Sequence, residues 1–176
     1  MKDKEEKKIE KDNGTVYRIG IIGTGRIAAR FLAEAREVKA AEVTIVYNPK
    51  RESAQKFEQQ WNVQSTDDLM LFFLMSDIVY VASPHETHYG YIQKALQKDK
   101  HVISEKPMVL KKAEAEKLCR LAEERNLILL EGIKTLYCPG YQMVLKLVAG
   151  GTIGTLCNVE ACFTKLEKRQ DRKSVV

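Results

Sequence analysis

The feature that most constrains the fold of this chain is an alternation of strand-length apolar runs with longer segments in which apolar residues recur at helical spacing. Strands separated by helices usually pair in parallel, because each helix carries the chain back to the edge where the previous strand began. We predict strands at Tyr17–Ile22, Glu42–Tyr47, Asp77–Ala82, His101–Ser104 and Leu127–Leu130. We predict helices at Arg26–Glu37, Arg51–Trp61, Thr87–Gln97 and Lys111–Arg125, and a shorter one that begins at a capping Asp67. The pattern therefore predicts an α/β fold built on a doubly wound parallel sheet.

The two ends of the chain depart from this alternation. Residues 1–15 hold five lysines and five acidic residues with almost no apolar side chain, which predicts a disordered, solvated tail. After Tyr137 a helix is expected to end at Gly150, and Ile153–Thr164 then has the pattern of a further strand. A single strand cannot bury its own faces. We therefore expect a first domain over residues 16–135 and, over 136–176, the truncated start of a second α/β domain.

Charge and composition exclude several classes of protein. The chain has 176 residues, 44% of them hydrophobic and 30% charged, which is typical of a globular protein with a packed core. Its net charge is +5, but the residues from Lys165 onward contribute five cations against two anions. The preceding residues are close to neutral and lack a basic face with aromatic platforms, so we expect no nucleic-acid partner.

The four cysteines form no C-x-x-C pair, and we expect no metal site. The apolar runs have the length of strands rather than of membrane spans, and no signal peptide opens the chain. We accordingly expect no membrane partner, a cytoplasmic location and reduced thiols.

The glycine turn at residues 23–28, with the sequence Gly-Thr-Gly-Arg-Ile-Ala, follows the first predicted strand and opens the first predicted helix. In a dinucleotide-binding turn, Gly23 would permit the tight bend and Gly25 would let the backbone approach a pyrophosphate. The amino terminus of the helix would then offer free N–H groups to the phosphates. The alternative is a tight turn that binds nothing. Cofactor contacts are expected from Gly23, Thr24, Gly25, Arg26 and Ile27.

The end of the second predicted strand bears on the choice between NAD and NADP. A dinucleotide fold usually places an acidic residue there to bind the ribose hydroxyls, but this chain has Asn48. Asparagine can still bond to a hydroxyl and lacks the charge that repels a 2′-phosphate, and Lys50 and Arg51 follow it. The alternative is a polar turn whose cations only decorate the next helix. We expect these three residues at the cofactor, which is NAD or NADP.

Two more clusters follow the strands predicted at Asp77–Ala82 and His101–Ser104. In open parallel sheets the ligand crevice lies outside the carboxyl ends of the strands. We expect cofactor contacts from Ser83, Pro84, His85, His88, Glu105 and Lys106. Taken singly, a histidine here is more often a loop or capping residue, and Glu105 and Lys106 could be a simple ion pair in a turn. The bond from Lys106 to Pro107 is of the kind that can be cis.

Taken in order and spacing, these motifs give the chain a family resemblance. The glycine turn is followed by Pro84-x-x-x-His88 and Ala95-Leu96, by Lys100-His101-Val102-Ile103-Ser104-Glu105-Lys106-Pro107, and by Gly151-Thr152-Ile153-Gly154. The chain resembles the Gfo/Idh/MocA oxidoreductases over residues 17–163.

The resemblance implies a Rossmann domain that binds NAD(H) or NADP(H), followed by an α/β substrate domain that often mediates oligomerisation. Lys106 matches the family's motif lysine, which lies near the nicotinamide and the reacting carbinol and assists proton transfer. Glu105 matches the glutamate beside it, and Pro84 and His88 match residues of the cofactor loop. The implied activity is hydride transfer to or from a carbon of a sugar or polyol, which would be the small-molecule partner.

Members of this family are considerably longer, and their other proton-transfer residues come from the second domain. We therefore expect a truncated chain that binds the cofactor and is inactive by itself. The alternative is a non-catalytic dinucleotide-binding module or subunit. A methyltransferase would favour an acidic residue where Ile21 and Ile22 precede the glycines. A short-chain dehydrogenase needs a Tyr-x-x-x-Lys pair, which is absent at Tyr89, Tyr91, Tyr137 and Tyr141.

Overall fold

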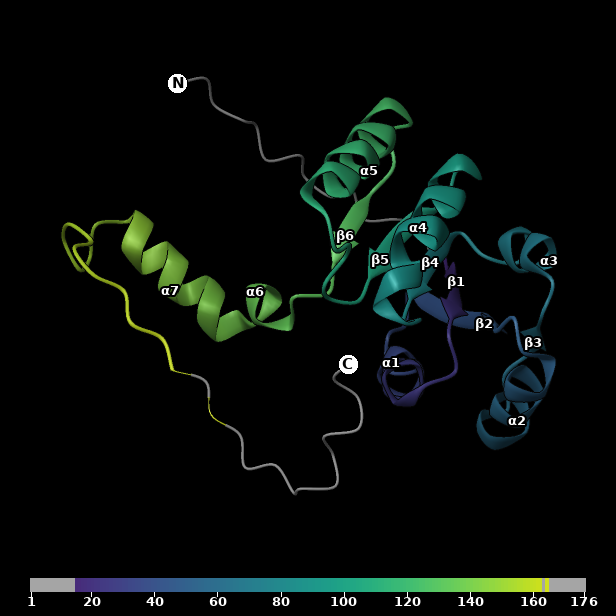
Figure 1. Cartoon of the computed structure of the whole chain (residues 1–176). Coiled ribbons are helices and arrows are strands. Elements are labelled where there is room, and N and C mark those ends of the chain that lie inside the picture. The colour runs from purple at the N-terminus through teal and green to yellow at the C-terminus, as the bar shows by residue number, and fades with distance from the viewer. Residues whose placement is uncertain (1–14, 163, 165–176) are drawn as a thin grey trace. The chain divides into compact units, whose positions relative to one another are not determined.

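The computed structural model of the protein describes residues 15–162 and 164 (Figure 1). The chain divides into two compact units between Ile133 and Lys134. The first unit contains a sheet of six strands in the order β3-β2-β1-β4-β5-β6, and every neighbouring pair is parallel. The strands are β1 (Tyr17–Ile22), β2 (Ala41–Tyr47), β3 (Ser65–Thr66), β4 (Ile78–Val81), β5 (His101–Ser104) and β6 (Leu129–Glu131). The strand order reverses at β1, which confirms the predicted doubly wound sheet.

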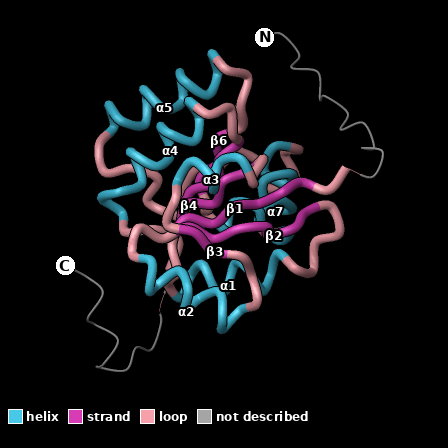
Figure 2. The backbone as a smooth tube through the Cα atoms, turned by 90° about the vertical axis from the view of Figure 1, so that its right-hand side faces the viewer, coloured by secondary structure: helices cyan, strands magenta, loops and turns pink. Residues whose placement is uncertain are grey.

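Helices cover both faces of this sheet (Figure 2). The helices α1 (Arg26–Ala35) and α2 (Arg51–Trp61) lie on one face, and α3 (Leu69–Leu74), α4 (His88–Gln97) and α5 (Lys112–Glu124) lie on the other. Each face has its own apolar core, because side chains of successive strand residues point to opposite sides. The core under α1 and α2 includes Ile19, Ile21, Ala28, Leu32, Val46, Phe57 and Tyr80. The core under α3, α4 and α5 includes Ile22, Ile45, Tyr47, Phe72, Val79, Ile92, Leu96 and Leu118.

The predicted elements differ from the observed ones mainly at their ends. Strand β3 was not predicted, because its two residues, Ser65 and Thr66, are polar and form no apolar run. The short helix α3 begins at Leu69 rather than at Asp67, and its cap is Asp68: the Asp68 carboxylate accepts hydrogen bonds from the amides of Met70 and Leu71. A 3₁₀ turn, η1 (His85–Thr87), precedes α4, so the predicted helix from Thr87 is two elements.

The described part of the second unit contains two helices, α6 (Lys134–Tyr137) and α7 (Pro139–Ala149). Proline at the first position of α7 and Gly150 at its end suit a helix with these limits. The strand predicted at Ile153–Thr164 is wrong: residues 153–162 and 164 contain no strand. A strand needs a neighbour for its backbone hydrogen bonds, and the described part of this unit offers no other strand. The predicted tail, apart from Thr15, lies outside the described residues.

An ion pair joins β1 to the turn before β4 at the amino-terminal edge of the sheet. The Arg18 guanidinium donates to both carboxylate oxygens of Asp77, at 2.6 Å and 3.0 Å, and the backbone amides of the two residues also bond across the pair. The side-chain hydrogen bond from Arg18 lowers the pKa of the Asp77 carboxyl below its usual value. Both side chains are about half-exposed, so the pair fixes register more than it adds stability.

Gly20 in β1 should not tolerate a side chain. A Cβ there would lie 2.6 Å from Phe72 and 2.9 Å from the Cβ of Ser76, and both neighbours are fully buried. We expect Gly20→Ala to lower the free energy of unfolding by about 1–3 kcal/mol, as overpacking does elsewhere. Gly90→Ala in α4 is the matched control, because no described atom lies within 4 Å of that Cβ position. It should raise stability by up to about 1 kcal/mol. Urea unfolding measures both, and equal effects would contradict the packing described.

Candidate functional site

The loops that follow β1, β4 and β5 meet at the carboxyl edge of the sheet, because these three strands are adjacent and parallel. Backbone hydrogen bonds continue past the strand ends and tie the loops together. The amide of Ala82 donates to the carbonyl of Ile22 at 2.9 Å, and the amide of Glu105 donates to the carbonyl of Val81 at 2.8 Å. The glycine turn, the Ser83–His88 loop and the Glu105–Pro107 segment therefore border one region, as their placement at strand ends predicted.

The glycine turn has the geometry that glycine at its positions 23 and 25 suggests. Gly23 has a φ of +113°, and a Cβ there would lie 2.6 Å from the carbonyl oxygen of Ala82. Gly25 is exposed, and no described atom lies within 4 Å of its Cβ position. It is the N-cap of α1, and no side chain in the described part of the protein bonds to that helix end. The first amides of α1 thus remain available to an anionic group above Gly25.

Asn48 links the end of β2 to the glycine turn. Its Nδ2 donates to the hydroxyl of Thr24 at 2.7 Å, and its Oδ1 accepts from the amide of Lys50 at 2.9 Å. The first bond fixes the turn, and the second starts α2. Lys50 and Arg51 are exposed at the beginning of that helix. The structure thus groups Thr24, Asn48 and the two cations on the β2 side of the glycine turn.

The loop after β4 is held by its own hydroxyl groups. The Thr87 hydroxyl lies 2.8 Å from Oγ of Ser83 and 2.7 Å from the carbonyl oxygen of Pro84. Pro84 and His85 are exposed, and Ser83 is half-buried. These three residues are therefore accessible at the carboxyl edge of the sheet.

His88 differs from the other residues of that loop, because its ring is fully buried. Its Nδ1 lies 2.9 Å from the carbonyl oxygen of Pro107, and its Nε2 lies 2.8 Å from the carbonyl oxygen of Ser83. The sequence predicted a cofactor contact at this position. The structure instead places the ring between two loops, with both nitrogens facing backbone oxygens.

Glu105 contacts a residue that the sequence analysis missed. The hydroxyl of Tyr80, in β4, donates to Oε1 of Glu105 at 2.5 Å. Burial, and then the hydrogen bond to Glu105, raise the pKa of the Tyr80 hydroxyl above its usual value, so it remains a donor. Its ring stacks on Phe31 of α1, with ring centroids 3.7 Å apart. Tyr80 was assigned only to a buried strand, and nothing in its local pattern distinguishes it from a core residue.

Lys106 is exposed, and within the described residues its side chain forms no hydrogen bond or ion pair. The ion pair with Glu105 considered as a simple alternative is therefore not formed. The peptide bond between Lys106 and Pro107 is cis. The Lys106 ammonium is free to contact a ligand at this edge.

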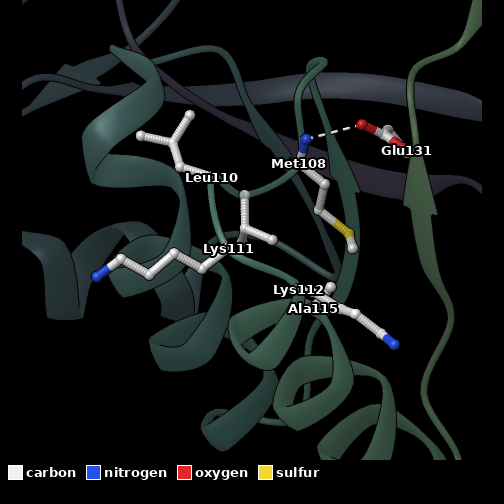
Figure 3. Close-up of a pocket in the computed structure, with 7 residues that line it drawn as sticks. Met108, Leu110, Lys111, Lys112, Ala115 and Glu131 are labelled. Atoms are coloured by element: carbon white, nitrogen blue, oxygen red, sulfur yellow. Dashed lines mark hydrogen bonds between the residues drawn. The ribbon is translucent and has the colours of Figure 1, made fainter.

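A small cavity of about 200 Å³ lies beside this segment (Figure 3). The amide of Met108 points to the carboxylate of Glu131, at the end of β6, and donates to it at 2.8 Å. A second cavity, of about 280 Å³, lies where β2 ends, against α3 and α4. Tyr47 and Tyr91 line it, and burial raises the pKa of Tyr47 to about 12.

Comparison with known protein families agrees with this geometry. The model of an oxidoreductase family with an NAD-binding Rossmann fold, Gfo/Idh/MocA, matches residues 17–133.

Curated relatives are similar along most of the chain. A dTDP-3,4-didehydro-2,6-dideoxy-α-D-glucose 3-reductase from Actinomadura kijaniata is 31% identical over 90% of this chain and 48% of its own length. A scyllo-inositol 2-dehydrogenase (NADP(+)) from Bacillus subtilis is 30% identical over 89% of this chain and 48% of its own length. The chain thus spans about half the length of the curated relatives it matches.

Solved structures show the same likeness. A 3-ketoreductase from Actinomadura kijaniata in complex with NADP and TDP-benzene has a TM-score of 0.70 at 29% identity, over 78% of this chain and 43% of its own. A scyllo-inositol dehydrogenase from Lactobacillus casei, with bound NAD(H) and scyllo-inositol, has a TM-score of 0.71 at 25% identity, over 80% of this chain and 43% of its own.

Gly23 should be required for the fold of the turn itself. Any side chain there would be strained twice, by the positive φ and by the contact with the Ala82 carbonyl. We expect Gly23→Ala to lower the free energy of unfolding by about 1–3 kcal/mol in the absence of any ligand. Chemical denaturation measures this, and a variant as stable as the parent would contradict the turn geometry.

Proposed function

The chain belongs to the Gfo/Idh/MocA family of oxidoreductases, and from this premise we propose that residues 17–133 bind a nicotinamide dinucleotide across the carboxyl ends of β1, β2, β4 and β5. The single observation that carries the proposal is the uncapped amino terminus of α1 above Gly25. A pyrophosphate needs backbone donors, a positive dipole end and no Cβ in its way, and this turn provides all three.

The other cofactor contacts are assigned to residues around that turn that are exposed or half-buried. Thr24, Arg26 and Ile27 are next to the pyrophosphate position, and Asn48, Lys50 and Arg51 are on the ribose side. Ser83, Pro84 and His85 border the other side, followed by Glu105 and Lys106. The cavity at Tyr47 is of a size to take part of the adenosine moiety.

We assign the protein a hydride transfer to or from a carbon of a sugar or polyol. The nicotinamide, when bound, takes up or supplies the hydride. In the oxidising direction the hydroxyl group also loses its proton, and we assign the Nζ of Lys106 to hold or move it. The printed names of the relatives, which include a sugar-nucleotide reductase and an inositol dehydrogenase, support this substrate class.

The chain spans about half the length of those relatives. We therefore do not assign substrate binding to residues 17–133 alone. A non-catalytic module would bind the same cofactor without turnover. NADPH formed on incubation with NADP⁺ and scyllo-inositol would identify the oxidoreductase, since a non-catalytic module transfers no hydride.

We further propose that NADP is preferred over NAD. The residue directly after β2 is Asn48 and not a carboxylate that would repel a 2′-phosphate, and its amide bonds to Thr24 and to the amide of Lys50. Lys50 and Arg51 provide two nearby cations.

Asn48→Asp should reverse this preference, because the new carboxylate can accept from the ribose hydroxyls of NADH and repels the 2′-phosphate of NADPH. We expect the ratio of the two dissociation constants to shift by about tenfold or more toward NADH. Titration of cofactor fluorescence measures both. Lys56→Met, a cation in the middle of α2, serves as the charge control, and an unchanged ratio in Asn48→Asp would contradict the assignment.

Gly25→Ala tests the main proposal. The substitution meets no described atom and the φ of −85° suits alanine, so the variant should remain folded, with stability within about 1 kcal/mol of the parent. It should nevertheless weaken NADPH binding by about tenfold or more, because the methyl group occupies the pyrophosphate position. Isothermal titration calorimetry measures the affinity. A folded Gly25→Ala protein with parental affinity, or a parent that binds no dinucleotide at millimolar concentration, would overturn the proposal.

A further inference from the structure

We propose that His88 is a positioning residue for Lys106, and that it acts through a hydrogen bond from its Nδ1 to the carbonyl oxygen of Pro107. The inference rests on the proposed function, since Lys106 must contact the nicotinamide half of the cofactor for its position to matter. His88 is not itself assigned a contact with the cofactor.

The position of the His88 ring is the first observation. The side chain is fully buried at the start of α4, although an apolar residue would fill the same space without polar atoms to satisfy. Its two nitrogens face two carbonyl oxygens, of Ser83 and Pro107, at 2.8 Å and 2.9 Å. A carbonyl oxygen only accepts, so a ring nitrogen bonds to it only while carrying a hydrogen. The ring therefore lies between the loop after β4 and the segment after β5, and the proposal assigns a hydrogen to Nδ1, which faces Pro107.

The second observation is that the residues on either side of Lys106 are each fixed by a different buried or half-buried group. Tyr80 donates to the Glu105 carboxylate on one side. On the other side His88 faces the carbonyl of Pro107, and Glu131 accepts from the amide of Met108. Lys106 itself is exposed and has no partner within the described residues. Its backbone is thus held on both sides while its ammonium group stays free, which is the arrangement required of a pre-positioned proton-transfer group.

Two amide substitutions separate the two contacts of the ring nitrogens. The amide nitrogen of asparagine reproduces the position of Nδ1, which faces Pro107, and that of glutamine reproduces Nε2, which faces Ser83. His88→Asn can therefore keep the contact with Pro107, next to Lys106. His88→Gln can keep only the contact with Ser83. The two variants are nearly matched in size and polarity, so a general loss of packing affects both. Urea unfolding checks that both are folded.

The readout is the affinity for NADPH compared with that for 2′-phospho-ADP-ribose, which lacks the nicotinamide. We expect His88→Gln to weaken NADPH binding by about fivefold and to leave 2′-phospho-ADP-ribose binding within about twofold. His88→Asn should resemble the parent with both ligands. Lys106→Met should likewise weaken the binding of NADPH but not that of 2′-phospho-ADP-ribose. In the double variant, His88→Gln should cause no further loss of NADPH affinity.

Each other outcome overturns the inference. Equal effects of the asparagine and glutamine substitutions would show that the bond to Pro107 has no special role. Additive effects of His88→Gln and Lys106→Met, or no effect of Lys106→Met, would show that His88 does not act through Lys106. A parent chain that binds neither ligand would overturn the proposed function as well, which distinguishes the two failures.

Discussion

The parallel pairing of β1 with β2 on one side and β4 on the other is the interaction on which the rest of the structure depends. Because the strand order reverses at β1, the connections on its two sides leave toward opposite faces of the sheet, and an opening remains at the carboxyl ends. Gly20 permits this arrangement inside β1, where α3 approaches the strand closely. Gly23 permits it at the strand end, where the turn passes the Ala82 carbonyl.

The site consists of loops that are fixed from the interior while their outer atoms remain exposed. Asn48 donates to Thr24 of the glycine turn, and Tyr80 donates to Glu105. The ring of His88 lies between the loop after β4 and the segment after β5. These polar contacts have buried or half-buried partners, where a hydrogen bond is stronger and an unpaired group is costly. The exposed Lys106 therefore stands between residues that are held by contacts inside the protein.

The sequence allowed the sheet to be predicted, because apolar periodicity is a local signal, and the glycine turn that the candidate site rests on is local as well. Strand β1 and helix α2 have the predicted limits. The contacts of Tyr80 and His88 could not be predicted, because each depends on a partner in another loop. The strand at Ile153–Thr164 was wrong for a related reason: its apolar residues favour a strand, but pairing depends on a neighbour that local sequence cannot specify.

The central claim, that this edge of the sheet binds a nicotinamide dinucleotide, is tested most directly by mapping the backbone amide resonances of the ¹⁵N-labelled chain during titration with NADPH. The account predicts saturable shifts concentrated in residues 23–27, 48–51, 83–88 and 104–108. It predicts unchanged resonances at the opposite edge, around Arg18 and Asp77. Saturable shifts centred on that opposite edge, or no shifts at millimolar NADPH, would contradict it.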